Sequence, residues 1–213
     1  MWNKLKILQA VVDSGIVAIV RTDSAESALE LCEACKAGGV KTLEVTLTTP
    51  GALEVIKTLR NKYDDSQLIV GAGTVLDSES ARLAIFAGAQ FVVTPALNVD
   101  AVRLCNRYQI PTMPGAMSVA EILAAMECGA DIIKLFPGDA FEPGIIKSIK
   151  APLPHAPLMP TGGVTVDNVE EWFRNGSVAV GVGGSLTAPA KNGDYEAVTR
   201  LAQEFIKRIQ ATR

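Results

Sequence analysis

The sequence predicts a compact (β/α)₈ TIM barrel with an extra helix at its N-terminus. Eight short runs rich in β-branched and other apolar residues recur along the 213-residue chain. The runs alternate with turn residues and with longer stretches of helical spacing. This alternation favours a parallel α/β fold, and eight strand–helix units favour closure into a barrel. A doubly wound open sheet remains an alternative, because counting strands does not exclude it.

The first expected element is an amphipathic helix that precedes the first strand. Leu5, Leu8, Val11 and Val12 have the required spacing. The expected strands then cover residues 16–20, 41–46, 67–71, 90–94, 110–114, 131–136, 156–161 and 178–182. We treat residues 1–213 as one barrel domain, because no linker or low-complexity segment interrupts the pattern.

Helix boundaries are marked by capping residues and glycines. Thr49–Pro50 offers an N-cap followed by proline at the first helical position, and Ser118 with Glu121 forms a capping box. Thr165 is placed to cap the helix after the seventh strand. Glycines such as Gly88 and Gly129 predict helix ends.

Composition excludes several classes of function. The net charge is −3 and the pI is about 5.3, so no basic surface favours a nucleic-acid or membrane partner. No apolar run is long enough to span a membrane. Cys32 and Cys35 lie in a helical pattern without a second pair, which favours plain thiols in a reducing cytoplasm. His155, the single histidine, lies between prolines, which argues against a histidine-cluster metal site and against a Ser-His triad unless His155 is its base. We expect no cofactor.

Lys134 is the most informative residue, because it interrupts the apolar strand 131–136. Side chains alternate along a strand, so Ile133 and Leu135 face the helices while Lys134 points into the barrel near the end where active sites lie. Apolar neighbours disfavour the charged ammonium and favour a neutral amine that can attack a ketone. A structural interpretation stays open: Lys134 could form a buried ion pair or extend out of the barrel mouth.

The second strand carries a polar stripe on its inward face. Thr42, Glu44 and Thr46 alternate with Leu43 and Val45. A carboxylate inside a barrel is costly unless it has a partner or a function. Glu44 is therefore the candidate for proton transfer.

Two glycine loops predict a phosphate site. Gly162 and Gly163 end the seventh strand, while Gly184 and Ser185 follow the eighth. Barrels frequently bind phosphate with the backbone of these two loops. The glycine runs at 71–76 and 181–186 lack the last glycine of a dinucleotide fingerprint, so we reject that interpretation. At the ends of other strands, Arg21 could bind a carboxylate or could equally be a solvated loop residue.

The motifs in combination resemble the 2-dehydro-3-deoxy-phosphogluconate aldolase / 4-hydroxy-2-oxoglutarate aldolase family. The resemblance extends over nearly the whole chain and is carried by AGGVKTLEVTLTTPGA, IVGAGTVL, AGAQFVVTPAL, MPGAMSVAEI, IIKLFPGD, LMPTGGVTVDNVEEWF and VGVGGSL. It implies a metal-free class I aldolase on a (β/α)₈ barrel, usually a homotrimer. The implied reaction is reversible cleavage of 2-dehydro-3-deoxy-6-phosphogluconate, its galactonate epimer or 4-hydroxy-2-oxoglutarate. The products are pyruvate and glyceraldehyde 3-phosphate or glyoxylate.

The resemblance also implies roles for single residues. Lys134 matches the Schiff-base lysine and Glu44 the general acid/base. The positions that match substrate contacts are Thr74 and Thr161 at the pyruvate end, Pro95 and Phe136 in the apolar walls, and Gly162, Gly163, Gly184 and Ser185 in the phosphate loops. Thr48 occupies a position where many members have arginine on the substrate carboxylate, and Arg21 could supply the missing charge.

Two other functions fit the same barrel. A phosphosugar isomerase or epimerase needs acid/base groups but no imine, and fold alone does not separate it from an aldolase. A non-catalytic phosphosugar-binding barrel would keep the glycine loops without needing both Lys134 and Glu44.

Overall fold

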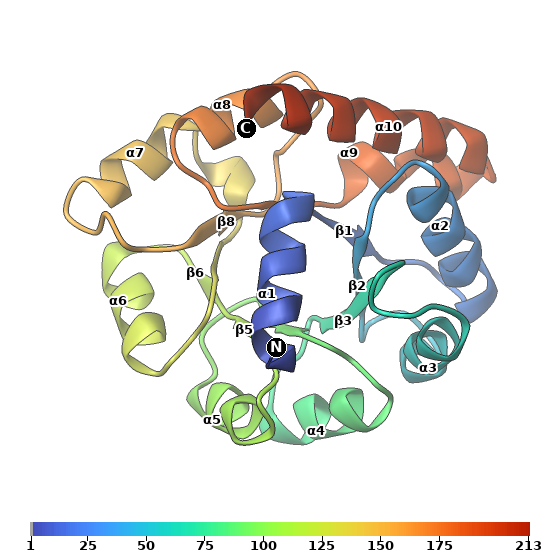
Figure 1. Ribbon diagram of the computed structural model, residues 1–213, viewed down its shortest axis with the longest axis horizontal. Coiled ribbons are helices and arrows are strands. Elements are labelled where there is room, and N and C mark those ends of the chain that lie inside the picture. Colours follow the sequence, from blue (N-terminus) through green and yellow to red (C-terminus); the bar gives the residue numbers. More distant parts are fainter. Residues whose placement is uncertain (1) are drawn as a thin grey trace.

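The computed structural model describes residues 2–213 as a parallel α/β fold with helices around the outside of the strands (Figure 1). The strands are β1 (Ile16–Val20), β2 (Thr42–Thr46), β3 (Ile69–Gly73), β4 (Val92–Val93), β5 (Thr112–Met113), β6 (Gly115–Ala116), β7 (Ile133–Leu135), β8 (Leu158–Pro160) and β9 (Val180–Val182). The helices are α1 (Asn3–Ser14), α2 (Ala25–Ala37), α3 (Ala52–Lys62), α4 (Ser78–Phe86), α5 (Val99–Tyr108), α6 (Val119–Glu127), α7 (Gly144–Lys150), α8 (Val169–Arg174), α9 (Gly184–Thr187) and α10 (Tyr195–Thr212). Two short 3₁₀ helices are η1 (Gly138–Ala140) and η2 (Ala188–Asn192).

The strands form two parallel sheets. One contains six strands in the order β5-β4-β3-β2-β1-β9, and the other contains β6-β7-β8. Two features join them: Thr161, directly after β8, bridges Gly181 of β9 in parallel, and β5 and β6 lie on either side of Pro114. Proline has no N–H to donate, which interrupts the ladder at Pro114. Its carbonyl still accepts a hydrogen bond of 3.0 Å from the backbone N–H of Lys134.

Strand residues alternate between two hydrophobic clusters, as the sequence pattern predicts. Leu43, Val45, Ile133 and Leu135 belong to the larger cluster, which also contains the buried helix side chains. The smaller, inner cluster contains Ile7, Val11, Val17, Ile69, Phe91, Val93, Met113, Ile132, Met159 and Ala179. Apolar burial on both faces is typical of a parallel sheet covered by helices.

The N-terminal helix α1 lies across the middle of the strand arrangement (Figure 1). Ile7 and Val11 are buried in the inner cluster. Lys4 is also mostly buried and forms an ion pair with Asp131, with Nζ 2.9 Å from Oδ1. The prediction that Leu5 shares the buried face is wrong, because its side chain is 49% exposed. The buried face instead follows positions 4, 7 and 11.

Two predicted helix starts are also wrong. Helix α3 begins at Ala52 after Gly51, which has a φ of 72°, and Thr49 instead accepts a hydrogen bond from the backbone N–H of Thr22. Helix α8 begins at Val169, and its N-cap position is held by Asn168 rather than by Thr165. In contrast, the capping box of Ser118 and Glu121 is confirmed at the start of α6.

Strand β3 extends two residues further than predicted, through Gly73. Close neighbours require glycine at Gly71, where the predicted strand ended, and at Gly73, where β3 ends. A Cβ on Gly71 would lie 2.3 Å from the Phe91 ring, and one on Gly73 would lie 1.8 Å from the carboxylate of Glu44. The strand therefore makes room for an inner-cluster side chain and for a candidate site residue.

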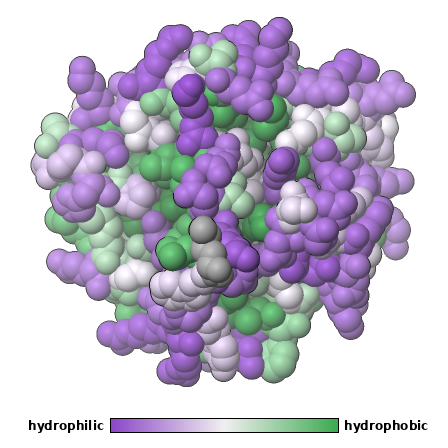
Figure 2. Space-filling model, viewed as in Figure 1, coloured by the Kyte–Doolittle hydropathy of each residue, from purple (hydrophilic) through white to green (hydrophobic). Residues whose placement is uncertain are grey.

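The face of the molecule on which α1 lies is dominated by hydrophilic side chains, with hydrophobic ones gathered in the recesses between them (Figure 2). Within residues 2–213, no helix combines the length and the apolar character needed to cross a bilayer.

Candidate active site

A cavity of about 560 Å³ lies at the carboxyl ends of the strands. We call it the strand-end cavity. It is lined by Ile19, Arg21, Glu44, Thr74, Pro95, Lys134, Phe136, Thr161, Gly162, Gly163, Val164, Thr165, Gly181, Gly183, Gly184, Ser185, Thr187 and Lys191. All but one of the predicted site residues lie here, brought together from strands far apart in the sequence. The position matches that of active sites in parallel barrels.

Lys134 is held in the cavity wall by β7. It pairs in register with Gly115 of β6 and Met159 of β8, and it is only 5% exposed. Its Nζ lies 4.6 Å from the centroid of the Phe136 ring, so the apolar wall expected from the sequence is present. Burial and pairing with both neighbouring strands fix the amine where it can meet a ligand in the cavity.

Glu44 is held by β2 between the two neighbouring strands. It pairs with Ile19 of β1 and Gly71 of β3, and it is 1% exposed. Its Oε2 atom is buried without a hydrogen-bond partner among the described residues. Burial raises the pKa of Glu44, and the positive charges of Lys134 and Arg21 only partly oppose this effect. A carboxyl group with a raised pKa can exchange protons closer to neutral pH.

Within residues 2–213, Glu44 and Lys134 do not form the ion pair that the structural interpretation of Lys134 requires. Lys134 is absent from the ion pairs of this part of the chain, and the open oxygen of Glu44 has no polar contact. A buried polar atom without a partner is costly. The arrangement therefore leaves both groups available to a bound molecule.

Arg21, Thr74 and Thr161 supply polar groups at the same strand ends. Nη2 of Arg21 donates to Oγ1 of Thr74 over 3.4 Å. Thr74 has a φ of 55°, a conformation that β-branched residues rarely adopt and that costs about 1–3 kcal/mol. Thr161 is buried, and Gly181 leaves room for it, because a Cβ there would lie 2.3 Å from its hydroxyl oxygen. Strain and close packing at these positions fix the two hydroxyls beside the cavity.

The two glycine loops meet at the cavity. Gly162 and Gly163 have φ values of 96° and 67°, which favour glycine. Ser185 donates a hydrogen bond from its hydroxyl to the carbonyl oxygen of Val164, which ties the loops after β8 and β9 together. Among the described residues, none accepts from the backbone N–H groups of Gly163 and Gly184. A Cβ on Gly184 would meet only open space. The loops thus present free N–H donors to the cavity.

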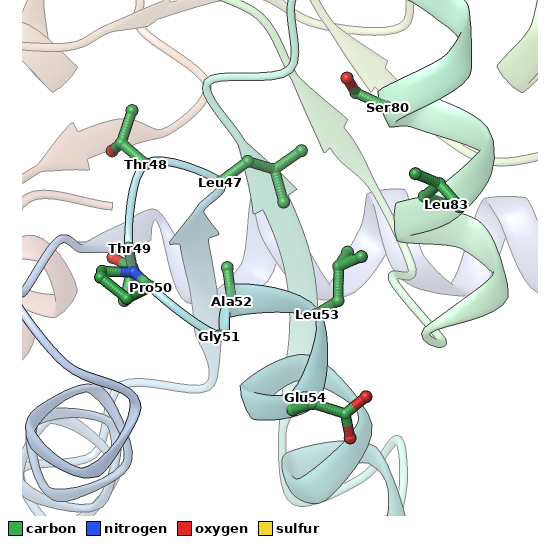
Figure 3. Close-up of a pocket in the computed structure, with 10 residues that line it drawn as sticks. All are labelled: Leu47, Thr48, Thr49, Pro50, Gly51, Ala52, Leu53, Glu54, Ser80 and Leu83. Carbon is green, nitrogen blue, oxygen red and sulfur yellow. The ribbon is translucent and has the colours of Figure 1, made fainter.

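Thr48 lies apart from the other predicted site residues. It occupies the loop after β2, on the edge of a second hollow of about 630 Å³. Figure 3 shows the apolar side chains of Leu47 and Leu53 on one side of this hollow and Ser80 and Leu83 of α4 on the other. The hydroxyl of Thr48 lies 3.1 Å from that of Thr46. Arg21, which does line the strand-end cavity, is therefore the arginine available at this end of the site.

Sequence reasoning missed several cavity residues. Ile19 and Gly181 share the inward face of their strands with neighbouring site residues, and strand alternation alone could have identified them. Thr187 and Lys191 lie beyond the eighth strand in α9 and η2. No local sequence motif identifies these two residues, because their position at the cavity depends on how the chain folds back after β9.

The thiols and the histidine are remote from this chemistry. Cys32 and Cys35 are free and buried, and burial raises the pKa of Cys35 to about 12. Such thiols are poor nucleophiles. His155 lies in the exposed loop before β8. Residues 2–213 contain no group of three or more histidine, cysteine and carboxylate side chains placed to share a metal ion.

Comparisons with known proteins identify the family of the chain. The family model described as KDPG and KHG aldolase matches residues 7–201. The 2-dehydro-3-deoxy-phosphogluconate aldolase of Treponema pallidum is 33% identical over 207 residues, covering 95% of this chain and 97% of that protein.

Two solved structures are similar along almost the whole chain. One is a KDPG aldolase from Legionella pneumophila with pyruvate captured as a covalent carbinolamine intermediate, with a TM-score of 0.83, 29% identity and coverage of 95% and 97% of the two chains. The other is the 2-keto-3-deoxy-6-phosphogluconate aldolase of Zymomonas mobilis with 3-phosphoglycerate, with a TM-score of 0.82, 29% identity and coverage of 95% and 94%.

Fold, cavity and likenesses define the class of protein: an aldolase, which is a carbon–carbon lyase. More closely, the chain belongs to the KDPG and KHG aldolase family.

Proposed function

We propose that the chain is a class I aldolase that reversibly cleaves 2-dehydro-3-deoxy-6-phosphogluconate, or a close relative of it, to pyruvate and an aldehyde. The observation that carries this proposal is the pair of buried groups, Lys134 and Glu44, in one cavity without a direct ion pair. The glycine loops beside them support a phosphorylated substrate. The close relatives whose names state this chemistry support the same substrate class.

In this mechanism Lys134 forms the covalent bond to substrate. Its neutral amine attacks the keto carbon, and the resulting carbinolamine loses water to give an iminium ion. The iminium accepts the electron pair of the C3–C4 bond when that bond breaks. An enamine of pyruvate and a free aldehyde result, and protonation and hydrolysis of the enamine release pyruvate and restore the lysine.

Glu44 moves the protons that these steps require. As an acid it assists loss of water from the carbinolamine, and as a base it removes the proton of the C4 hydroxyl group when the C3–C4 bond breaks. Its raised pKa suits both roles, since burial makes the two protonation states closer in free energy at neutral pH. The unpartnered Oε2 atom is the group that we place against the substrate or a water.

The remaining polar groups hold the two ends of the substrate. We assign Arg21, Thr74 and Thr161 to the carboxylate and the loops containing Gly162, Gly163, Gly184 and Ser185 to the phosphate. Pro95 and Phe136 form apolar walls. Binding both ends orients the scissile bond between Lys134 and Glu44, so that remote contacts contribute to the rate. We propose no role in substrate contact for Thr48, because it lies on the other hollow. We propose no metal and no cofactor, because the iminium itself serves as the electron sink.

The test is reduction with borohydride in the presence of pyruvate, followed by intact mass measurement and peptide mapping. We expect one reduced pyruvate per chain, attached to Lys134 and lost in Lys134→Ala. The same folded protein with no adduct would exclude imine chemistry. Such a result, together with interconversion of phosphosugars, would favour the isomerase or epimerase instead.

We also infer that the two sheets make one interrupted (β/α)₈ barrel and that residues 1–213 form one domain. The bridge between Thr161 and Gly181 and the continuity of β5 and β6 across Pro114 support closure. The bridge brings the end of β8 next to β9, whereas in an open sheet the edge strands would lie far apart.

We further propose a cytoplasmic homotrimer. Large apolar side chains are exposed on or next to α4, α5 and α6: Leu76, Leu83, Phe86, Tyr108, Met117, Val119 and Leu123. The hollow beside Leu83 includes the apolar side chains of Leu47 and Leu53 in its lining (Figure 3). Large apolar patches are typical of interfaces between subunits. Light scattering at micromolar concentration should give three chains per particle. A particle of one chain would contradict the assembly without affecting the proposed chemistry.

A further inference from the structure

The strand-end cavity contains a cation that the proposed reaction leaves without a role. Lys191 lies on the cavity wall, in the 3₁₀ helix η2 that directly follows α9. The glycine loop residues Gly184 and Ser185 belong to α9 and line the same cavity. Lys191 is therefore only a few residues from the proposed phosphate loops, beyond the eighth strand.

Lys191 is free to meet a ligand. It is exposed, and none of the ion pairs within residues 2–213 includes it. The other residues of η2 carry no charge. A lysine ammonium binds phosphate as a mobile point charge on a flexible stem, so an exposed position on a cavity rim suits this role.

The charges of the cavity lead to the same role. Its charged side chains are Arg21, Glu44, Lys134 and Lys191. Arg21 acts with Thr74 at the carboxylate end, and Lys134 is committed to the keto carbon. Without Lys191, a phosphate carrying about 1.5–2 negative charges would meet only neutral donors at its end of the cavity. Lys191 supplies the missing positive charge.

We propose that Lys191 binds the phosphate of the substrate and thereby determines the preference for phosphorylated over unphosphorylated keto acids. This inference rests on the proposed aldolase function and assigns to Lys191 binding and specificity, not bond cleavage. Because the interaction is between a side chain at the rim and a dianion, it acts mainly through KM and weakens as salt is added.

The experiment compares cleavage of 2-dehydro-3-deoxy-6-phosphogluconate with cleavage of the same acid lacking phosphate. The variants are Lys191→Gln, Lys191→Arg and a matched control, Lys57→Gln, which removes an exposed lysine of α3 outside the cavity. We expect Lys191→Gln to lower kcat/KM for the phosphorylated acid about fivefold to tenfold, through KM. The unphosphorylated acid should be cleaved at an unchanged rate. Lys191→Arg should retain most of the preference, and Lys57→Gln all of it.

A second readout uses inorganic phosphate as a competitive inhibitor of cleavage of the phosphorylated acid, because both would bind the proposed phosphate loops. Its inhibition constant should rise by a similar factor in Lys191→Gln and stay unchanged in Lys57→Gln. The proposal is overturned if Lys191→Gln changes kcat/KM for both acids equally or for neither. Failure of the aldolase function is a separate result, because the unmodified protein would then cleave neither acid and form no pyruvate adduct.

Discussion

The amino ends and the carboxyl ends of the strands differ in chemistry while using the same alternation. At the amino ends, Val17, Ile132 and Met159 point inward and pack with α1 in the inner cluster. Two residues further along the same strands, Ile19, Lys134 and Thr161 line the strand-end cavity. Two residues along a strand therefore separate the apolar inner cluster from the candidate active site. The free energy gained by apolar packing at the amino ends (the closed end) can offset the cost of burying charged groups at the carboxyl ends (the open end). The two ends can be tested separately.

The largest effect is expected from removing the amine at the open end. Lys134→Ala should abolish detectable turnover, because Lys134 is the buried amine of the cavity, whereas its other lysine, Lys191, is exposed. The turnover rate is measured in stopped assays with the phosphorylated keto acid, and circular dichroism establishes that the variant is folded. Its free energy of unfolding should not fall, since the substitution removes a buried amine that has no ion-pair partner. A folded variant with substantial turnover would remove Lys134 from the mechanism.

The second largest effect is expected from Glu44, whose replacement should change both the rate of cleavage and the stability of the protein. Glu44→Gln should lower kcat by about 10²–10⁴-fold, the usual contribution of a general acid/base. In the unaltered protein, kcat/KM should fall as pH decreases through the raised pKa of Glu44, where the base becomes protonated. A near-normal rate in Glu44→Gln would exclude Glu44 as the proton-transfer group.

The stability part of this prediction has the opposite sign. Because burial raises the pKa of Glu44, the folded state binds a proton that the unfolded state has already lost. Stability therefore falls as pH rises from the unfolded pKa of about 4.3 to the raised value. Glutamine does not titrate, so Glu44→Gln should melt at a higher temperature at neutral pH and at the same temperature below that window. Melting curves at acid and neutral pH check this, and a lower melting temperature at pH 7 would contradict it.

At the closed end the expectation is a loss of stability without a loss of catalysis. Ile7→Ala should lower the free energy of unfolding by about 2–4 kcal/mol, because it leaves a cavity in the inner cluster. Leu5→Ala in the same helix is the matched control and should cost about 0.5 kcal/mol or less, since Leu5 is 49% exposed. Denaturant unfolding measures both. A change in kcat/KM in folded Ile7→Ala would mean that α1 and the cavity are coupled.

The same comparison explains what could be predicted from the sequence. The period of two along each strand placed Glu44 and Lys134 inward, and the structure places both in one cavity, because alternation is a local property of the backbone. Positions fixed by packing between distant segments were missed. Leu5 was placed on the wrong face of α1, the helix after Pro50 began later than predicted, and β3 continued through Gly73 to make room for Glu44. Lys191 had no sequence signal, because its place depends on how η2 packs after β9.

The smallest expected effect is at the carboxylate end of the cavity. Arg21→Gln should raise the pyruvate concentration needed for half-maximal borohydride trapping about tenfold, the value of one charge-assisted hydrogen bond. The maximal extent of trapping should stay unchanged, because Arg21 does not form the imine. Arg21→Lys keeps the charge but loses the two-pronged geometry of the guanidinium group. The pyruvate concentration that it needs should therefore lie between those of the unaltered protein and Arg21→Gln. Lys41→Gln, an exposed residue just before β2, is the control at the opposite end of a strand. If Arg21→Gln traps pyruvate as readily as that control does, the carboxylate is held by the hydroxyls of Thr74 and Thr161 alone, and the charge of Arg21 acts only on Glu44.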